Sequence, residues 1–151
     1  MTDLFIPIDE GVRITLPAGL VEFLQDVTTA LDLVGTKGDD PALPRFKVPV
    51  YLDDGDANEE YWRWMGSELD ESRAADRSAF GIIVDASEEG VDVSLAEAHG
   101  FLRVLVEIRL ALAARLGVEV EADYQALAHT DAVVLDTLAE LQVLLLNALA
   151  P

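Results

Sequence analysis

Two acidic motifs in the middle of the chain have a spacing that could bind a divalent cation. The stretch "ELDE" carries two glutamates three positions apart, and "EGVD" carries a glutamate and an aspartate at the same spacing. Four carboxylates could hold magnesium against a triphosphate, because hard cations prefer oxygen ligands. They give one alternative function, a metal-dependent all-α nucleotide pyrophosphohydrolase, whose ligands would be Glu68, Glu71, Glu89 and Asp92.

The surroundings of the second motif disfavour this metal site. The pattern is similar to that of MazG-type hydrolases, in which both acidic pairs lie on helices. Here "EEGVDVS" contains Gly90 and two β-branched valines, so no helix is expected at that point. Because 29 of the 151 residues are acidic, chance matches are also common. The favoured interpretation therefore has no metal, no cofactor and no catalytic residue.

The acidic stretch "DDGDANEEYW" is interpreted as a helix start rather than a calcium loop. An EF-hand loop beginning at Asp54 would need glycine in place of Glu59 and a bidentate glutamate in place of Met65. Asp56 and Glu59 instead form a capping-box-like pair, and acidic residues in a first turn complement the helix dipole.

The chain has no cysteine and only two histidines, and most familiar catalytic signatures are absent from it. His99 and His129 each lack the preceding glutamate of the di-metal motif found in helical bundles. The motifs of zinc proteases, serine hydrolases and phosphate-binding loops are missing as well. We expect both histidines to be surface or half-buried residues.

Arg109 is the most informative single residue. On a helical wheel it lies in the middle of a leucine stripe, where an unpaired charge would be costly. Asp76 interrupts the apolar face of the preceding helix, and Gln142 lies at the margin of the apolar face of the last one. We predict an interior polar cluster of Arg109, Asp76 and Gln142. Its favoured role is to fix the register of the helices, with ligand binding as the alternative. The stripe consists of Leu95, Leu102, Leu105, Leu112 and Leu116.

Aromatic residues early in the second long helix offer a surface for a protein partner. Trp62 should point inward, and Trp64 lies well round the helix from it. Because an exposed tryptophan is a typical interface anchor, we expect Tyr61 and Trp64, with the edge of the N-terminal hairpin, to form the partner surface. A second copy of the chain, giving a homodimer, remains open.

The composition restricts the partner and the compartment. A formal net charge of −19 repels nucleic acid and anionic lipid, so neither is expected as a partner. The first ten residues show no signal peptide, and Glu107, Arg109 and Arg115 interrupt the best membrane-span candidate, so no span is expected. We expect a soluble, cytoplasmic protein, which suits the absence of cysteine.

Periodicity predicts the elements that position these residues. Alternating apolar residues predict a hairpin, and steps of three and four predict four long helices with a short helical segment at 121–129. The expected fold is mainly all-α, an antiparallel four-helix bundle with a small N-terminal β-hairpin. It forms a single domain, 1–151, with the hairpin at 3–16 and helices at 17–34, 58–86, 95–116 and 130–148.

Several residues mark the ends of these elements. Pro7 cannot donate a hydrogen bond to a neighbouring strand, so its strand should lie at an edge. Gly11 is expected to supply the positive φ of the hairpin turn. Ser94 with Glu97 predicts an N-cap, and Gly117 predicts the end of the third long helix. That helix is apolar on nearly every side and should be the central one.

Three stretches resemble a known family. They are "DPALPRFKVPVYLDD", "RLALAARLGV" at 109–118 and "LDTLAELQVLL" at 135–145. They are similar to an actinobacterial domain-of-unknown-function family of short acidic proteins, often encoded beside the Clp protease adaptor. A hairpin followed by a helix also matches the N-terminus of that family.

The resemblance implies which residues correspond to the family pattern. Its two arginines map to Arg109 and Arg115, and its glutamine maps to Gln142. The chain departs from the family at Val106 and Glu107, where Asn-Asp is common, and near Ala113 and Thr137. Together with the residue patterns above, the family resemblance implies a non-enzymatic cytoplasmic interaction or regulatory protein, linked to regulated proteolysis.

Overall fold

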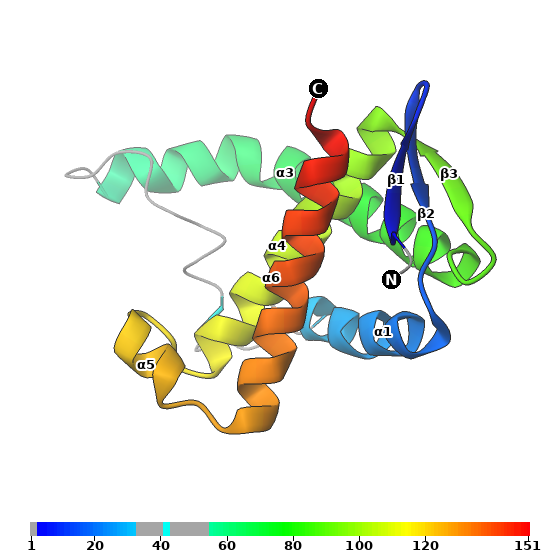
Figure 1. The fold of residues 1–151 in the computed structure, drawn as a ribbon. Helices are drawn as coiled ribbons and strands as arrows, with labels where there is room; N and C mark the ends of the chain where they lie inside the picture. The colour runs from blue at the N-terminus through cyan, green and yellow to red at the C-terminus, as the bar shows by residue number, and fades with distance from the viewer. Residues whose placement is uncertain (1–2, 33–40, 43–54) are drawn as a thin grey trace.

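The computed structural model describes residues 3–32, 41–42 and 55–151, apart from the side chains of 58 and 61–70. The fold is mainly α, with one small sheet formed by N-terminal and central residues (Figure 1). In the described part of the chain, the helices are α1 (Ala18–Asp32), α3 (Gly55–Ala86), α4 (Leu95–Arg115), α5 (Glu121–Gln125) and α6 (His129–Leu149).

The four long helices begin and end within three residues of the predicted bounds wherever both ends are described. The described part of the acidic stretch lies at a helix start, as predicted, but α3 already begins at Gly55, so Asp56 is inside the first turn and not in the predicted cap position. Short helix α5 confirms the segment expected within 121–129. The predicted end of the first helix, at residue 34, lies outside the described residues.

The sheet has three antiparallel strands rather than two. Strands β1 (Phe5–Ile8) and β2 (Gly11–Ile14) form the predicted hairpin, and β3 (Val91–Ser94) pairs with β2. The order is β1-β2-β3, so Pro7 lies on an edge strand as expected. Because two strands alone are marginal in water, the third strand and the helices beneath supply the missing support.

Gly11 is needed for a reason other than the predicted positive φ. The described residues with positive φ are Gly90 and Gly117, so Gly11 does not need that conformation. Gly11 lies opposite Ser94 in the β2–β3 ladder, and a Cβ there would collide with the carbonyl oxygen of Val93. Glycine is required because a neighbouring backbone approaches closely.

Both predicted ends of α4 are confirmed. The Ser94 hydroxyl accepts the Glu97 amide at 3.1 Å, and the Glu97 carboxylate accepts the Ser94 amide at 3.1 Å, a complete capping box. Gly117 adopts φ of 77° just beyond the last turn. Ser94 is also the last residue of β3, so sheet and helix meet without a connecting loop.

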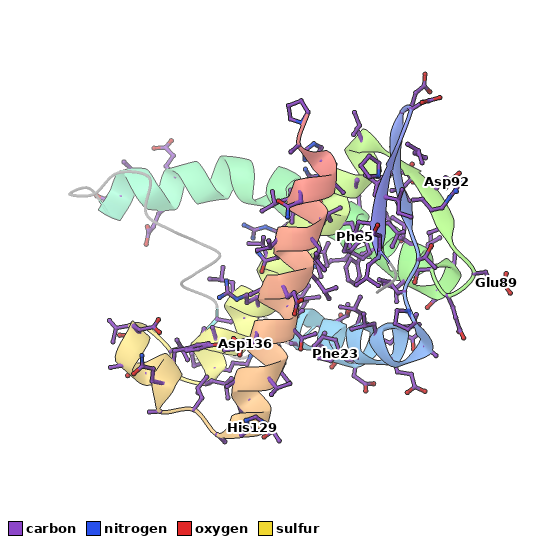
Figure 2. All side chains as sticks on the ribbon, viewed as in Figure 1. Phe5, Phe23, Glu89, Asp92, His129 and Asp136 are labelled. Atoms are coloured by element: carbon purple, nitrogen blue, oxygen red, sulfur yellow. The ribbon has the colours of Figure 1, made fainter. Side chains whose placement is uncertain are left out.

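Helix α4 is central, as expected. It contacts α1, α3, α6 and the sheet, and Phe101 in its first half stacks on Phe80 of α3 with ring centroids 4.4 Å apart. Phe5 of β1, labelled in Figure 2, meets the Phe101 ring edge-on, with centroids 6.3 Å apart. The buried core extends from β1 to α6. An antiparallel four-helix bundle is not confirmed, because α1 and the first part of α3 cross α6 in Figure 1 rather than aligning with it.

Helix α6 is apolar over most of its length. It packs on α4 and β1 through Leu135, Leu138, Leu141 and Leu145, which are buried. By length and composition alone it could cross a membrane, contrary to the expectation that no segment would pass this test. One face of α6 packs against the core, whereas Val133, Val143 and Leu146 are 46%, 55% and 51% exposed.

Candidate functional site

Arg109 is exposed, so the predicted interior cluster was wrong at its centre. The buried face of α4 runs through Phe101, Leu105 and Ile108, whereas Leu95 and Leu116 are 50% and 36% exposed. Arg109 follows Ile108 directly and is therefore about 100° round the helix from it. The leucine stripe did not identify the buried face of α4, because the helix has leucines on several sides. The buried face also includes phenylalanine, isoleucine and alanine residues.

Asp76 is bound to a different arginine. The Arg103 guanidinium donates to the Asp76 carboxylate through Nε at 2.8 Å and Nη2 at 3.0 Å, a two-bond pair between α3 and α4. Gly100 makes room for it, because a Cβ there would lie 3.0 Å from Asp76 Oδ1. The contact that we predicted for Arg109 is thus made by Arg103.

A second ion pair adjoins the first. Glu107 of α4 accepts from Arg77 Nε at 3.3 Å and lies 3.7 Å from Arg73 Nε, both on α3. Burial raises the pKa of the Glu107 carboxyl, and the two arginines offset only part of that effect. Arg73, Asp76, Arg77, Arg103 and Glu107 are called the α3–α4 charge network below.

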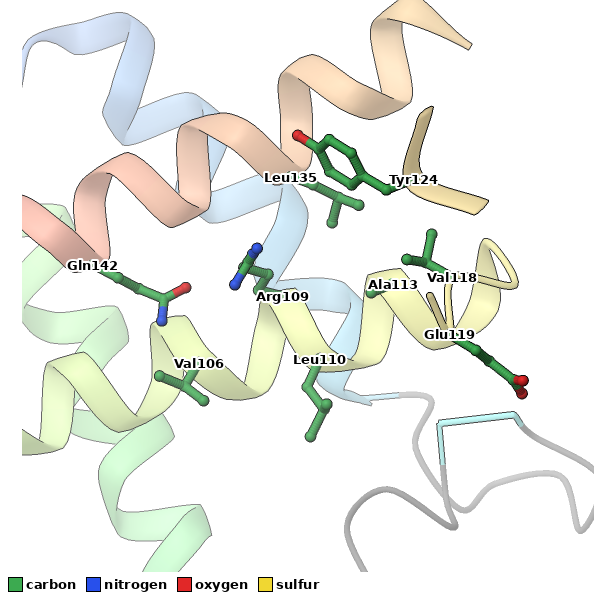
Figure 3. A pocket seen from close by; sticks show the side chains of 9 residues that line it. All are labelled: Val106, Arg109, Leu110, Ala113, Val118, Glu119, Tyr124, Leu135 and Gln142. Carbon is green, nitrogen blue, oxygen red and sulfur yellow. The ribbon is translucent and has the colours of Figure 1, made fainter. Parts of the chain in front are cut away.

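Arg109 and Gln142 do come together, in a pocket of about 300 Å³ between α4, α5 and α6. Figure 3 shows the Arg109 side chain between Gln142 and Tyr124, with the Gln142 amide turned towards it. This Arg109 pocket is lined by Val106, Arg109, Leu110, Ala113, Val118, Glu119, Tyr124, Leu135 and Gln142.

Two polar groups of the pocket lack partners within the described part of the chain. The Gln142 Oε1 atom is buried and accepts no hydrogen bond. Arg109 makes no hydrogen bond or ion pair there either. A buried acceptor without a donor costs free energy, and a guanidinium has five N–H donors to satisfy. The pocket can therefore accept an anion at Arg109, whereas Gln142 Oε1 has almost no accessible surface for a ligand to contact.

The third arginine of α4 has a structural role. Arg115 lies near the end of the buried face, and its Nη1 donates to the Ala30 carbonyl oxygen at 2.6 Å. Ala30 is in the last turn of α1, where carbonyl groups lack helical partners and a cation is favoured. Arg115 thus ties α4 to the end of α1.

The structure separates the carboxylates of the alternative metal site. Glu71 is exposed on α3, fifteen residues and about 22 Å of helix before Ala86. Asp92 lies on β3 and accepts from Arg13 of β2 at 2.7 and 3.1 Å, and that arginine holds the pKa of the Asp92 carboxyl below its usual value. Figure 2 shows Glu89 and Asp92 at the sheet, and the Glu68 side chain lies outside the described residues.

No three potential ligands among histidine, aspartate and glutamate gather for a metal within the described residues. His99 and His129 are both exposed. The side chains of Tyr61 and Trp64, predicted as a partner surface, lie outside the described residues. The hairpin edge is described, and Ile6 on β1 is 40% exposed there.

Sequence reasoning missed most of the pocket. Val106, Arg109, Leu110 and Ala113 are spaced by three, one and three residues, which places them on one face of a helix. Leu135 and Gln142 are seven residues apart and share a face of α6. These spacings were available in the sequence, but Tyr124 comes from the short α5, which no periodicity directs towards α4.

The chain belongs to a family of domains of unknown function. The family model described as "Domain of unknown function (DUF2017)" matches residues 5–149, which includes every described strand and helix. No curated protein and no solved structure matches the chain.

Proposed function

We propose that this chain is a non-enzymatic interaction protein that binds an acidic group of a protein partner in the Arg109 pocket. One observation carries the proposal: an exposed guanidinium, without a partner in the described residues, lies in a pocket whose lining is largely apolar. Since the unpaired cation attracts an anion, the partner group should be a carboxylate.

The charge balance of the chain strengthens this argument. The sequence has 29 acidic residues against ten basic ones, so acidic partners are abundant for every arginine. Arg103 of α4 and Arg77 of α3 have such partners, whereas Arg109 has none among the described residues. That leaves its guanidinium available for an external anion.

We extend the proposal to a regulatory role in the cytoplasm, linked to regulated proteolysis. This extension is supported by the family resemblance of the sequence motifs alone. The Arg109 pocket adds a physical means of contacting another protein and needs no bound metal.

The test is an affinity capture from the organism that encodes the chain, comparing three forms of the full-length protein. Wild type should enrich a defined partner, Arg109→Gln should lose it, and Glu140→Gln, an exposed change on α6, should retain it. Quantitative mass spectrometry measures the enrichment. Equal enrichment by the wild type and Arg109→Gln would reject the pocket as the interaction site.

A further inference from the structure

The Arg109 pocket adjoins a second pocket along the outer side of α4. This second pocket, of about 430 Å³, lies between α3 and α4, and both pockets include Val106 in their lining. Val106 is 43% exposed, so it forms the boundary between them. The two pockets together are called the α4 groove below. The other lining residues of the second pocket are Ser72, Arg73, Asp76, Leu102, Arg103 and Glu107.

The apolar residues that α4 contributes to the groove form one face of the helix. Leu102, Val106, Leu110 and Ala113 are spaced by four, four and three residues, which is the spacing of a ridge along an α-helix. The ridge extends over about 16 Å of the helix axis, or three turns. The buried Ile108 lies on the opposite side of α4. The groove therefore offers an apolar ridge, outside the core, on which a short helix can pack.

Arginines lie on both sides of this ridge. Arg73 and Arg103 line the pocket towards α3, and Arg109 lines the pocket towards α6. Three carboxylates also line the groove, those of Asp76, Glu107 and Glu119. Basic and acidic groups are thus equal in number here, whereas the whole chain has 29 acidic residues against ten basic ones. Because Asp76 and Glu107 are bound to arginines of the α3–α4 charge network, Arg109 is the cation left for an incoming carboxylate.

We infer that the α4 groove binds an acidic amphipathic helix of a partner protein. The helix packs lengthwise on α4, places apolar side chains in the pockets on either side of Val106 and directs a carboxylate to Arg109. An amphipathic helix in an apolar groove is a common mode of peptide recognition, with apolar residues three and four positions apart as anchors. The inference rests on the proposed function and names the kind of partner segment.

Other occupants match the groove less well. An extended peptide would leave backbone groups without partners against an apolar ridge, whereas a helix satisfies its own. A basic helix would meet Arg73, Arg103 and Arg109. A second copy of this chain would bring another net charge of −19 into contact, which opposes association.

The test is a selection from a displayed library of random peptides of about fifteen residues, long enough for four helical turns, on the full-length protein. We expect the enriched peptides to have apolar residues three and four positions apart, with glutamate or aspartate beside them. The tightest binder is then synthesised and titrated by fluorescence anisotropy. Its helical circular dichroism should increase on binding, and replacing its acidic residues by glutamine should weaken binding at least tenfold.

Three variants of the protein locate the binding. Val106→Glu should weaken the peptide at least tenfold, because it puts a carboxylate between the two pockets, and Arg109→Gln should weaken it severalfold. Val143→Glu is the matched control, since it makes the same change at a 55% exposed valine of α6 outside the groove, and it should leave the dissociation constant unchanged. Thermal unfolding of each variant confirms that it is folded, and amide NMR shifts on binding should concentrate at residues 102–113.

The outcomes separate the inference from the proposed function. The inference is overturned if no peptide is enriched, if the enriched peptides lack helical spacing or acidic residues, or if Val106→Glu binds like the wild type. A dimer in sedimentation that Val106→Glu dissociates and Val143→Glu does not would also overturn it, since a second copy would then occupy the groove. If Arg109→Gln still loses the captured partner, the proposed function stands with a different kind of partner segment. If Arg109→Gln retains both the partner and the peptide, both fail.

Discussion

The α3–α4 charge network and the Arg109 pocket both depend on α4 arginines, and they differ in whether these arginines have partners. Arg103 is bound to Asp76 by two hydrogen bonds, and the other charges of the network face one another across the helix pair. Arg109, six residues further along, has no such contact among the described residues. Arg103 and Arg109 thus differ although both are on α4, because Arg103 faces α3 whereas Arg109 faces α5 and α6.

This difference implies opposite effects of mutation on stability. In the network, removing one partner leaves a charge without compensation, so the folded state should be weakened. In the pocket, removing a polar group relieves an unsatisfied atom, so the folded state should be strengthened or unchanged. The following predictions test this contrast through the free energy of unfolding.

Gln142→Met should have the largest effect. It replaces a buried oxygen without a donor by an apolar group of similar length, and we expect a gain of about 1–2 kcal/mol in the free energy of unfolding. Chemical denaturation measures the gain, with Gln125→Met, an exposed change on α5, as the control near zero. A loss of stability would show that Gln142 is satisfied in the folded protein.

Asp76→Ala should act in the opposite direction. We expect a loss of about 1 kcal/mol, since the pair has two good hydrogen bonds but Arg103 is 58% exposed to screening water. A double-mutant cycle with Arg103→Ala measures the coupling between the two side chains. A coupling free energy of zero would mean that the ion pair does not stabilise the folded state. The network and the pocket would then not differ in the stability effects of mutation.

Glu107 should give the network a pH dependence. Burial raises its pKa in the folded state, so from about 4.5 upwards the folded protein holds this proton more tightly than the unfolded chain. This contribution to the free energy of unfolding therefore falls as pH rises through that range. Denaturation between pH 4.5 and 7.5 should show the decline in wild type, less of it in Glu107→Gln, and the wild-type profile in Glu140→Gln. Identical profiles for all three would contradict the prediction.

Arg109→Met should have the smallest effect on stability. Because the guanidinium is exposed and without a partner in the described residues, the free energy of unfolding should change by about 0.5 kcal/mol or less. Thermal or chemical unfolding measures it. A loss of stability as large as that of Asp76→Ala would show that Arg109 stabilises the fold as Arg103 does. The network and the pocket would then not differ in this respect.

The fold could be predicted further than the site. Helical periodicity gave the four long helices to within three residues where both ends are described, and Ser94, Glu97 and Gly117 gave the ends of α4. Strand β3 was missed, because four residues between two helices carry little periodic signal. Its location in "EEGVDVS" nevertheless agrees with the argument that this motif is not helical.

The site was predicted only in part because a helical wheel shows which residues share a face, not which face is buried. Helix α4 is apolar on several sides, and the choice between them depended on where α3, α6 and the sheet lie. That information comes from contacts distant in sequence. Arg109 and Gln142 line the same pocket but do not form the interior cluster that we predicted, and Asp76 belongs to the network.

The junction at Ser94 couples two parts of the molecule that would otherwise open separately. Since one serine closes the last strand and caps the central helix, loosening the strand exposes the first helical amides, and fraying of the helix releases the strand. The hairpin and α4 should accordingly exchange their amide hydrogens as one cooperative unit, leaving α5, which has no buried residue, as the segment that exchanges first.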